Sequence, residues 1–316
     1  MSALVETMFY ANYNDNTGRF VPWHGLGTPV EEAPTSADAI VCAGLDWEVE
    51  ARQIKDSVSG LVIPNYYANV RTTDDSVLGI VGNRYEIIQN RDAFAFTDAM
   101  LDEGVTYETA GSLRDGKTIW LLAKMDSVKI LGDDVVPYLC FTNTHDGTGC
   151  VKVCLTPTRV VCNNTLNVAL KEASRTWSTR HMGNLTAKLE EAKHTLGLVA
   201  DYMSALDVEA DILANTKVDD EMLEKVITTI FPINDNDTER KIRNIEDSRK
   251  QFLNAYDELD IHKFKGTGWG VVNAMADFVD HHNIQRNTNT AKENRWANIM
   301  GGHPMLDKTH KIILAA

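Results

Sequence analysis

The stretch VPYLCFTNTHDGTGCVKVCLTP, residues 136–157, indicates the type of fold most directly. Its two halves are rich in β-branched and aromatic residues, and the polar pentapeptide HDGTG at 145–149 separates them. Such residues favour strands, and an Asp-Gly pair between two strand-like runs is compatible with a hairpin turn. We therefore expect two antiparallel strands here.

More strand-like runs precede this hairpin, beginning near Trp47. They are separated by the turn sequences TTDDS at 72–76 and RDGK at 114–117. Two helices are expected among them. A short one over 35–45 would be capped by Thr35 or Ser36 and stopped by Gly44, and one over 91–104 would be capped by Asn90 or Asp92.

After Pro157 the pattern becomes helical. Asn163 or Asn164 is expected to cap a helix that ends near residue 173, and residues 185–206 repeat apolar side chains at three- and four-residue steps. Further helices are expected at 218–231, 238–259 and 268–282.

Runs of strands followed by runs of helices predict an α+β fold. We expect a curved antiparallel meander with an inserted helix, followed by an all-helical C-terminal half. The predicted parts are an N-terminal arm at 1–34, a mixed strand and helix domain at 35–178 and a helical region at 179–316.

Composition narrows the class of protein. The 316 residues include five cysteines, and no apolar run approaches the roughly 20 residues that cross a bilayer. No leader peptide is recognisable, and an odd number of cysteines argues against a disulfide framework. We expect a soluble, cytoplasmic protein with reduced thiols and no membrane association.

Charge is unevenly distributed along the chain. The net charge of −14 argues against a protein that coats duplex DNA through a generally basic surface. Residues 140–194 differ from the rest, because seven Lys or Arg stand there against four Asp or Glu, a balance of +3. This basic segment is the candidate for binding an anionic partner.

A local basic groove could hold single-stranded nucleic acid, since cations bind phosphates, aromatic rings stack on bases and the amides at a helix start attract anions. The alternative is that these are isolated surface charges and that Trp177 packs between domains. The predicted binding residues are Lys152, Arg159, Asn163, Arg175, Trp177, Arg180 and His181, joined by Arg84 from a strand-to-helix junction that the fold could bring beside them.

The cysteines and histidines raise two other possibilities. Cys150 and Cys154 are four residues apart and Cys162 follows without any CxxC pair, which favours core cysteines over a metal site. A cysteine with His145 or His181 and an asparagine would suit nucleophilic catalysis, but the spacing selects no particular triple. We assign no catalytic residue, no metal and no cofactor.

Two glycine-rich segments lack the context of a nucleotide loop. GLGTP at 25–29 has no strand before it, and GTGWG at 266–270 starts a helix without the Lys-Ser/Thr ending. A plain helical N-terminal turn is the interpretation we favour for GTGWG.

Several separated motifs, in order, resemble the phage/plasmid-like proteins grouped as domain of unknown function 932. The motifs are VPWHGLG at 21–27, GNRYEIIQNRDAF at 82–94, GKTIWLLAKM at 116–125, TNTHDGTGCVKVCLTPTRVVCNNTLNVAL at 142–170 and STRHMGN at 178–184. The resemblance implies a role in phage replication, recombination or host interaction. A weaker likeness is to phage single-strand annealing proteins of the RecT type, whose cores place a curved antiparallel sheet against helices.

Three functions remain open. The first is non-catalytic binding, and perhaps annealing, of single-stranded nucleic acid in the host cytoplasm. The second is a phage–host interaction protein, or an anti-defence type of binder that sequesters a small anionic or nucleotide ligand. The third is a Cys/His hydrolase. A homo-oligomer is expected if the arm around Trp23 docks on a neighbouring copy.

Overall fold

The computed structural model describes residues 28–30, 33–95, 97–98, 105–159, 164–166, 168, 170, 174–182, 195–257, 262–282 and 289–315. The chain forms two compact units, each assembled from three segments. Unit 1 comprises Met1–Asp126, Tyr138–Leu155 and Ser174–Val199, and unit 2 comprises Ser127–Pro137, Thr156–Ala173 and Ala200–Ala316. Because these units interleave along the chain, the single boundary near residue 178 stays a prediction.

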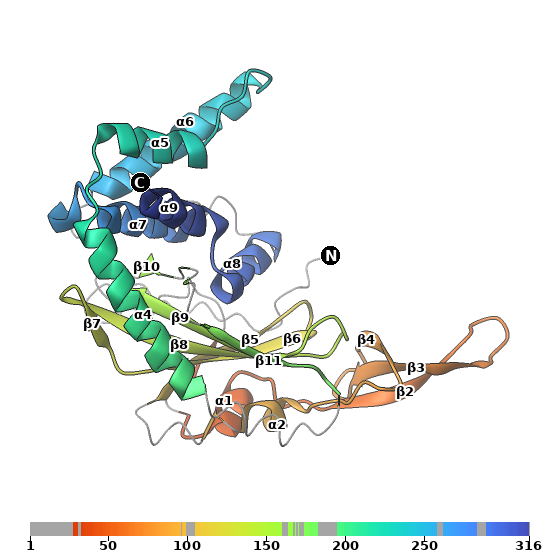
Figure 1. Cartoon of the computed structure of the whole chain (residues 1–316). Coiled ribbons are helices and arrows are strands. Elements are labelled where there is room, and N and C mark those ends of the chain that lie inside the picture. The colour runs from red at the N-terminus through yellow and green to blue at the C-terminus, as the bar shows by residue number, and fades with distance from the viewer. Residues whose placement is uncertain are drawn as a thin grey trace. The chain divides into compact units, whose positions relative to one another are not determined.

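Unit 1 contains a small three-stranded antiparallel sheet, ordered β2-β3-β4 (Figure 1). Its strands are β2 (Val49–Lys55), β3 (Val62–Arg71) and β4 (Val77–Gly82). The β2–β3 hairpin extends beyond the end of β4, and residues 55–66 are exposed. The turn predicted at 72–76 joins β3 to β4.

A second antiparallel sheet supplies most of the buried core of unit 1. Along the part that belongs to unit 1, the strands follow one another in the order β1-β5-β6-β8-β9, with β11 also paired to β9. The strands are β1 (Thr28–Pro29), β5 (Thr106–Leu113), β6 (Thr118–Lys124), β8 (Asp133–Thr144), β9 (Val151–Arg159) and β11 (Thr176–Thr179).

Burial in this sheet is nearly continuous rather than alternating. Ile119, Trp120, Leu121 and Leu122 of β6 are successive residues whose side chains alternate between the two faces of the sheet, and each is at most 3% exposed. A sheet covered on both faces produces such runs, and burying each large side chain contributes about 1.5–3 kcal/mol.

Two short helices of unit 1 are α1 (Ser36–Cys42) and α2 (Asn90–Phe94). Thr35 caps α1 by accepting a hydrogen bond from the backbone N–H of Asp38, and Gly44 follows the helix at a φ of 68°. Both roles agree with the sequence prediction.

Unit 2 is mainly helical. Its short strands are β7 (Val128–Ile130), which pairs with the start of β8, and β10 (Asn164–Thr165), which pairs with the end of β9. The helical elements are α4 (Thr195–Asn215, in this unit from Ala200 onward), α5 (Asp220–Ile230), α6 (Glu239–Asp257), η2 (His262–Phe264), α7 (Gly268–Asp277), η3 (Phe278–His282), α8 (Asn289–Gly301) and α9 (Pro304–Leu314).

Helix α7 lies at the centre of unit 2, with buried side chains on every face from Gly268 to Ala276. The glycines of GTGWG serve this packing. A Cβ on Gly270 would lie 2.3 Å from the carbonyl oxygen of Phe264, and Thr267 accepts a hydrogen bond from the Gly270 N–H. The segment is thus a capped helical N-terminus, as the sequence indicated.

The α+β class, the antiparallel sheets and the helical C-terminal half are confirmed. The helix predicted to begin at Asn163 or Asn164 is wrong where the structure describes it, because Asn164 and Thr165 form β10. Trp177 lies in the strand β11, in a segment where the sequence predicts no strand. Within the described residues, none of the helices combines the length and apolar character that crossing a bilayer requires.

Candidate functional site

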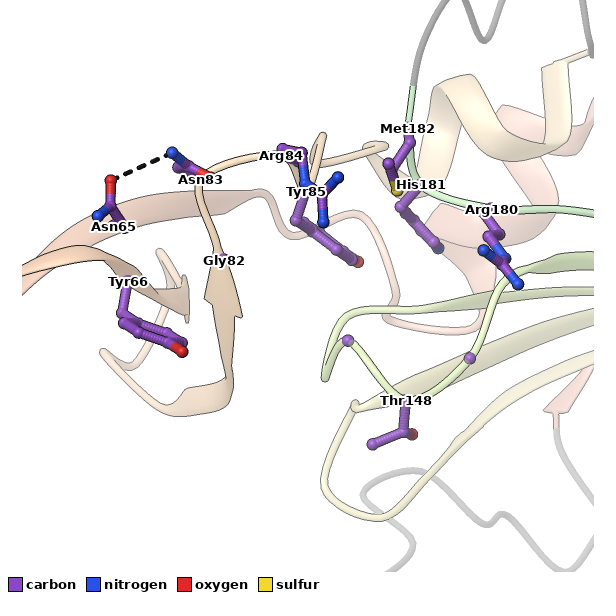
Figure 2. A pocket seen from close by; sticks show the side chains of 12 residues that line it. Asn65, Tyr66, Gly82, Asn83, Arg84, Tyr85, Thr148, Arg180, His181 and Met182 are labelled. Atoms are coloured by element: carbon purple, nitrogen blue, oxygen red, sulfur yellow. Dashed lines mark hydrogen bonds between the residues drawn. The ribbon is translucent and has the colours of Figure 1, made fainter.

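A pocket of about 610 Å³ opens on unit 1 (Figure 2). Its walls come from β3, from the end of β4 and the turn after it, from the β8–β9 loop and from the segment after β11. The lining residues are Asn65, Tyr66, Gly82, Asn83, Arg84, Tyr85, Gly147, Thr148, Gly149, Arg180, His181 and Met182. All of them except Tyr85 and His181 are exposed, so the pocket is open to solvent.

An irregularity in β3 brings Asn65 and Tyr66 to the pocket. Gln53 pairs with Tyr67 and Lys55 pairs with Val62, so two steps along β2 correspond to five along β3. The three additional residues of β3 form a wide bulge, and Asn65 within it has a φ of 66°. Bulges of this kind redirect side chains and are common beside functional sites.

The β8–β9 loop forms the wall next to β4, and its own sequence fixes its shape. The carboxylate of Asp146 accepts hydrogen bonds from the backbone N–H and the hydroxyl of Thr148, at 2.9 and 2.7 Å. Gly147 adopts a φ of 76°, which favours glycine. A Cβ on Gly79 of β4 would lie 2.4 Å from the Cα of Asp146, so the loop backbone rests directly on β4.

Tyr85 and His181 form an aromatic wall between the loop and the β4 turn. Their rings stack with centroids 4.7 Å apart and planes 11° apart. The Tyr85 hydroxyl donates to the carbonyl of Thr144 at 2.8 Å, and the backbone N–H of Glu86 donates to the carbonyl of His181 at 2.9 Å. These contacts tie the segment after β11 to the turn after β4.

His181 is a neutral wall residue rather than a cation. It is 2% exposed, and burial lowers its pKa to about 4. Its Nδ1 lies 3.3 Å from the carbonyl of Glu86, and its Nε2 is buried without a hydrogen-bond partner among the described residues. At neutral pH the His181 ring therefore carries no charge, and its predicted part in binding stays a prediction, as a neutral ring of the pocket wall.

His145, at the start of the same loop, belongs to a buried network. Its Nε2 lies 2.7 Å from the side-chain oxygen of Asn90, whose amide nitrogen donates to the carbonyl of Leu45. The edge of its ring meets Trp47 at a centroid distance of 5.4 Å. Burial lowers the pKa of His145 to about 3, which keeps the ring neutral.

Two of the described cysteines are unsuited to act as an activated nucleophile beside these histidines. Cys140 and Cys154 are buried, and burial raises the pKa of both thiols. A reactive cysteine needs a lowered pKa and access to solvent. Among the residues that the structure describes, no group of three His, Cys, Asp or Glu side chains is placed to hold a metal ion, and Cys162 lies outside them.

The guanidinium groups of Arg84 and Arg180 are the cations of the pocket. Both side chains are exposed, and neither forms an ion pair within the described part of the chain. The nearby carboxylate of Asp146 is 8% exposed and lies 3.1 Å from Arg114, which offsets its charge. The pocket therefore presents a positive end.

The structure unites part of the predicted binding set and separates the rest. Arg84 lines the same pocket as Arg180 and His181, although it is far from both in sequence. Lys152 pairs with Ser178, whereas Trp177 pairs with Val153, so Lys152 and Trp177 lie on opposite faces of the β9–β11 ladder. A single groove containing all the predicted residues is therefore not formed.

The other predicted residues are not among those that line the pocket. Arg175 places a guanidinium nitrogen 3.2 Å from the carbonyl of Leu155, which ties it to β9. Arg159 belongs to unit 2 at the end of β9, and Asn163 lies outside the described residues. The amides of a helix start at Asn164 are absent because that residue is in a strand.

Sequence reasoning missed Asn65, Tyr66 and the wall made by Gly147, Thr148 and Gly149. The sequence predicts that HDGTG forms a turn, but nothing in it indicates that this turn lines a pocket. The PNYY sequence at 64–67 carried a signal only in its Pro-Asn pair, which interrupts a strand-like run.

Comparison with known proteins identifies the family. One family, described as a domain of unknown function (DUF932), matches residues 77–300. The matched range includes Arg84 and Arg180, whereas Asn65 and Tyr66 lie before it. No curated protein and no solved structure gives a match, so the likeness to RecT-type proteins stays a prediction. Since the match covers most of the 316 residues, the chain belongs to the DUF932 family.

Proposed function

We propose that this protein binds single-stranded nucleic acid without catalysis, and that the unit 1 pocket holds the strand. The observation that carries the proposal is the pair of exposed guanidinium groups, Arg84 and Arg180, in one pocket. Neither has a carboxylate partner among the described residues. Guanidinium groups bind phosphate oxygens through paired hydrogen bonds, and unpaired ones are available to do so.

The form of the pocket favours a strand over an enclosed small ligand. Its lining is almost entirely exposed, which lets a chain enter on one side and leave on another. Tyr66, at 53% exposed, adds an aromatic ring on which a base could stack. Cations combined with an exposed aromatic are the elements that binding of a single strand requires.

The overall charge suits the same proposal. With a net charge of −14, most of the protein surface repels a stiff duplex. A flexible single strand can instead follow a short positive site. We propose, from the phage/plasmid-like resemblance, that the protein acts in recombination or annealing for a phage or mobile element, in the host cytoplasm and as a homo-oligomer.

A second candidate is a binder of a small nucleotide or other small anion. The volume of about 610 Å³ favours it, because this is within the range of small-molecule pockets. Calorimetry with a mononucleotide separates the two candidates. The strand proposal expects affinity to increase steeply from a mononucleotide to a longer oligonucleotide, whereas a small-ligand site would bind both equally.

Fluorescence anisotropy of a labelled 20-nucleotide oligothymidine in about 50 mM salt tests the proposal. The double variant Arg84→Ala, Arg180→Ala is expected to raise Kd at least about tenfold, since a hydrogen bond to a charged group contributes about 1.5–3 kcal/mol. The matched control is Arg91→Ala, because Arg91 is also exposed in unit 1 but lines no part of this pocket. Absence of binding by the wild type, or equal affinity of the double variant, would overturn the proposal.

A further inference from the structure

We infer that the end of the pocket formed by Asn65, Tyr66 and Asn83 receives a nucleobase. The base would stack on the Tyr66 ring and place its polar edge on the two amide side chains. This inference rests on the proposed function, because it concerns the base of the same strand whose phosphates Arg84 and Arg180 hold.

The pocket has two chemically different ends. Figure 2 shows Asn65, Tyr66 and Asn83 on one side, Arg180 and His181 on the opposite side, and Arg84 between them. The first end offers neutral donors, acceptors and an aromatic face. The second offers positive charge. A nucleotide has the same division, since its base is neutral and aromatic and its phosphate is anionic.

The bulge in β3 is the second observation that points to this end. A left-handed backbone at a residue other than glycine costs on the order of 1 kcal/mol and persists where the surrounding structure holds it. Asn65, at a φ of 66°, is exposed, and so is Tyr66. The distortion therefore does not serve core packing, and both residues line the pocket.

The two asparagines are held together in a defined arrangement. The amide nitrogen of Asn83 donates to the side-chain oxygen of Asn65 at 3.2 Å, and the backbone N–H of Asn83 donates to the carbonyl of Asn65 at 3.0 Å. Within the described residues, the side-chain oxygen of Asn83 and the amide nitrogen of Asn65 have no other partner. One acceptor and several N–H donors thus remain available side by side.

This pattern suits a base edge without selecting one base. Each base presents neighbouring donors and acceptors on its Watson–Crick edge, and proteins that bind unpaired strands use those edges together with stacking. Stacking of a base on an aromatic ring contributes about 1–3 kcal/mol. The expected recognition is of an unpaired base of any sequence, as opposed to a sugar-phosphate chain alone.

Two labelled oligonucleotides of equal length test the inference, one of thymidines and one of abasic sites, because they carry the same phosphates. The wild type is expected to bind the thymidine strand at least about tenfold more tightly. Tyr66→Leu should reduce that ratio, while Tyr66→Phe retains the ring and should preserve it. Asn65→Gly accommodates the positive φ and should lower the ratio without disturbing the fold.

The outcomes separate the two claims. If the wild type binds both strands equally, the base inference is overturned while the phosphate site stands. If it binds neither strand, the proposed function fails and the inference with it. An unchanged ratio in both Tyr66→Leu and Asn65→Gly would also overturn the inference, since the preference would then arise elsewhere.

Discussion

Lowering the pH from 7 to 5 is expected to destabilise unit 1 through the buried histidines of the pocket region. The pKa of His181 is lowered to about 4 and that of His145 to about 3, each from an ordinary value of 6.5. The folded state therefore resists protonation that the unfolded chain accepts. The stability that each neutral ring contributes is fully present above pH 6.5 and is lost as the pH falls toward the folded pKa.

The magnitude follows from the difference in bound protons. At pH 5 the unfolded histidine is almost fully protonated while the folded one remains neutral, which amounts to about 2 kcal/mol for each residue relative to pH 7. His145 and His181 together are expected to lower the free energy of unfolding by about 4 kcal/mol. Carboxylates add their own changes, so a variant is needed to isolate this effect.

Urea unfolding of His181→Phe at pH 7 and pH 5 isolates one histidine. Phenylalanine keeps a ring on Tyr85 and cannot titrate, so the variant should lose about 2 kcal/mol less than the wild type between the two pH values. His262→Gln is the control, because His262 is exposed and belongs to unit 2. An identical pH dependence in His181→Phe and the wild type would refute the reasoning.

Two further predictions concern the described backbone and thiols. Gly79→Ala should lower the free energy of unfolding by about 1–3 kcal/mol, because the added Cβ would lie 2.4 Å from the backbone of the β8–β9 loop. Gly82→Ala is the control, since its Cβ would have no neighbour nearer than 4.0 Å, and it should change the stability little in the same thermal unfolding assay. Equal losses would contradict the close packing. When the folded protein is alkylated and its peptides are analysed by mass spectrometry, Cys42 is expected to react before Cys140 and Cys154, because only Cys42 of these three is exposed. Early modification of either buried thiol would contradict the packing described for the sheet.

Local signals predicted the elements that depend on neighbouring residues. Thr35 and Gly44 mark the two ends of α1 because capping needs only residues near the helix end. The HDGTG turn is likewise determined locally, by Asp146 and its hydrogen bonds to Thr148. These parts of the fold could be predicted from the sequence alone.

Hydrogen-bond pairing between strands that are distant in sequence determines the elements that the sequence did not predict, β10 and β11. Residues 176–179 form β11 because they pair with β9, and Asn164 enters β10 for the same reason, although its local sequence resembles a helix cap. Propensity is a weak guide where an edge strand offers backbone hydrogen bonds. No short window of sequence contains that information.

In the candidate site, too, some features could be predicted from the sequence and others depend on strand pairing. Arg84 was expected beside Arg180, and the structure places both in one pocket. The register of β9 and β11 separates Lys152 from Trp177, which only the pairing of the two strands determines. Tyr66 lies where β3 loses its register with β2, and it pairs with Gly82 of β4, so its place in the pocket could not be recognised from the sequence.

The salt dependence of oligonucleotide binding tests the central claim most directly. Each phosphate contact on a single strand contributes about 0.7 to the slope of log K against log salt concentration. Because the double variant Arg84→Ala, Arg180→Ala removes two phosphate contacts, we expect it to reduce the magnitude of the slope by about 1.4. Arg91→Ala is expected to leave the slope unchanged. A slope that is the same in the double variant and the wild type would show that these two arginines do not hold the phosphates.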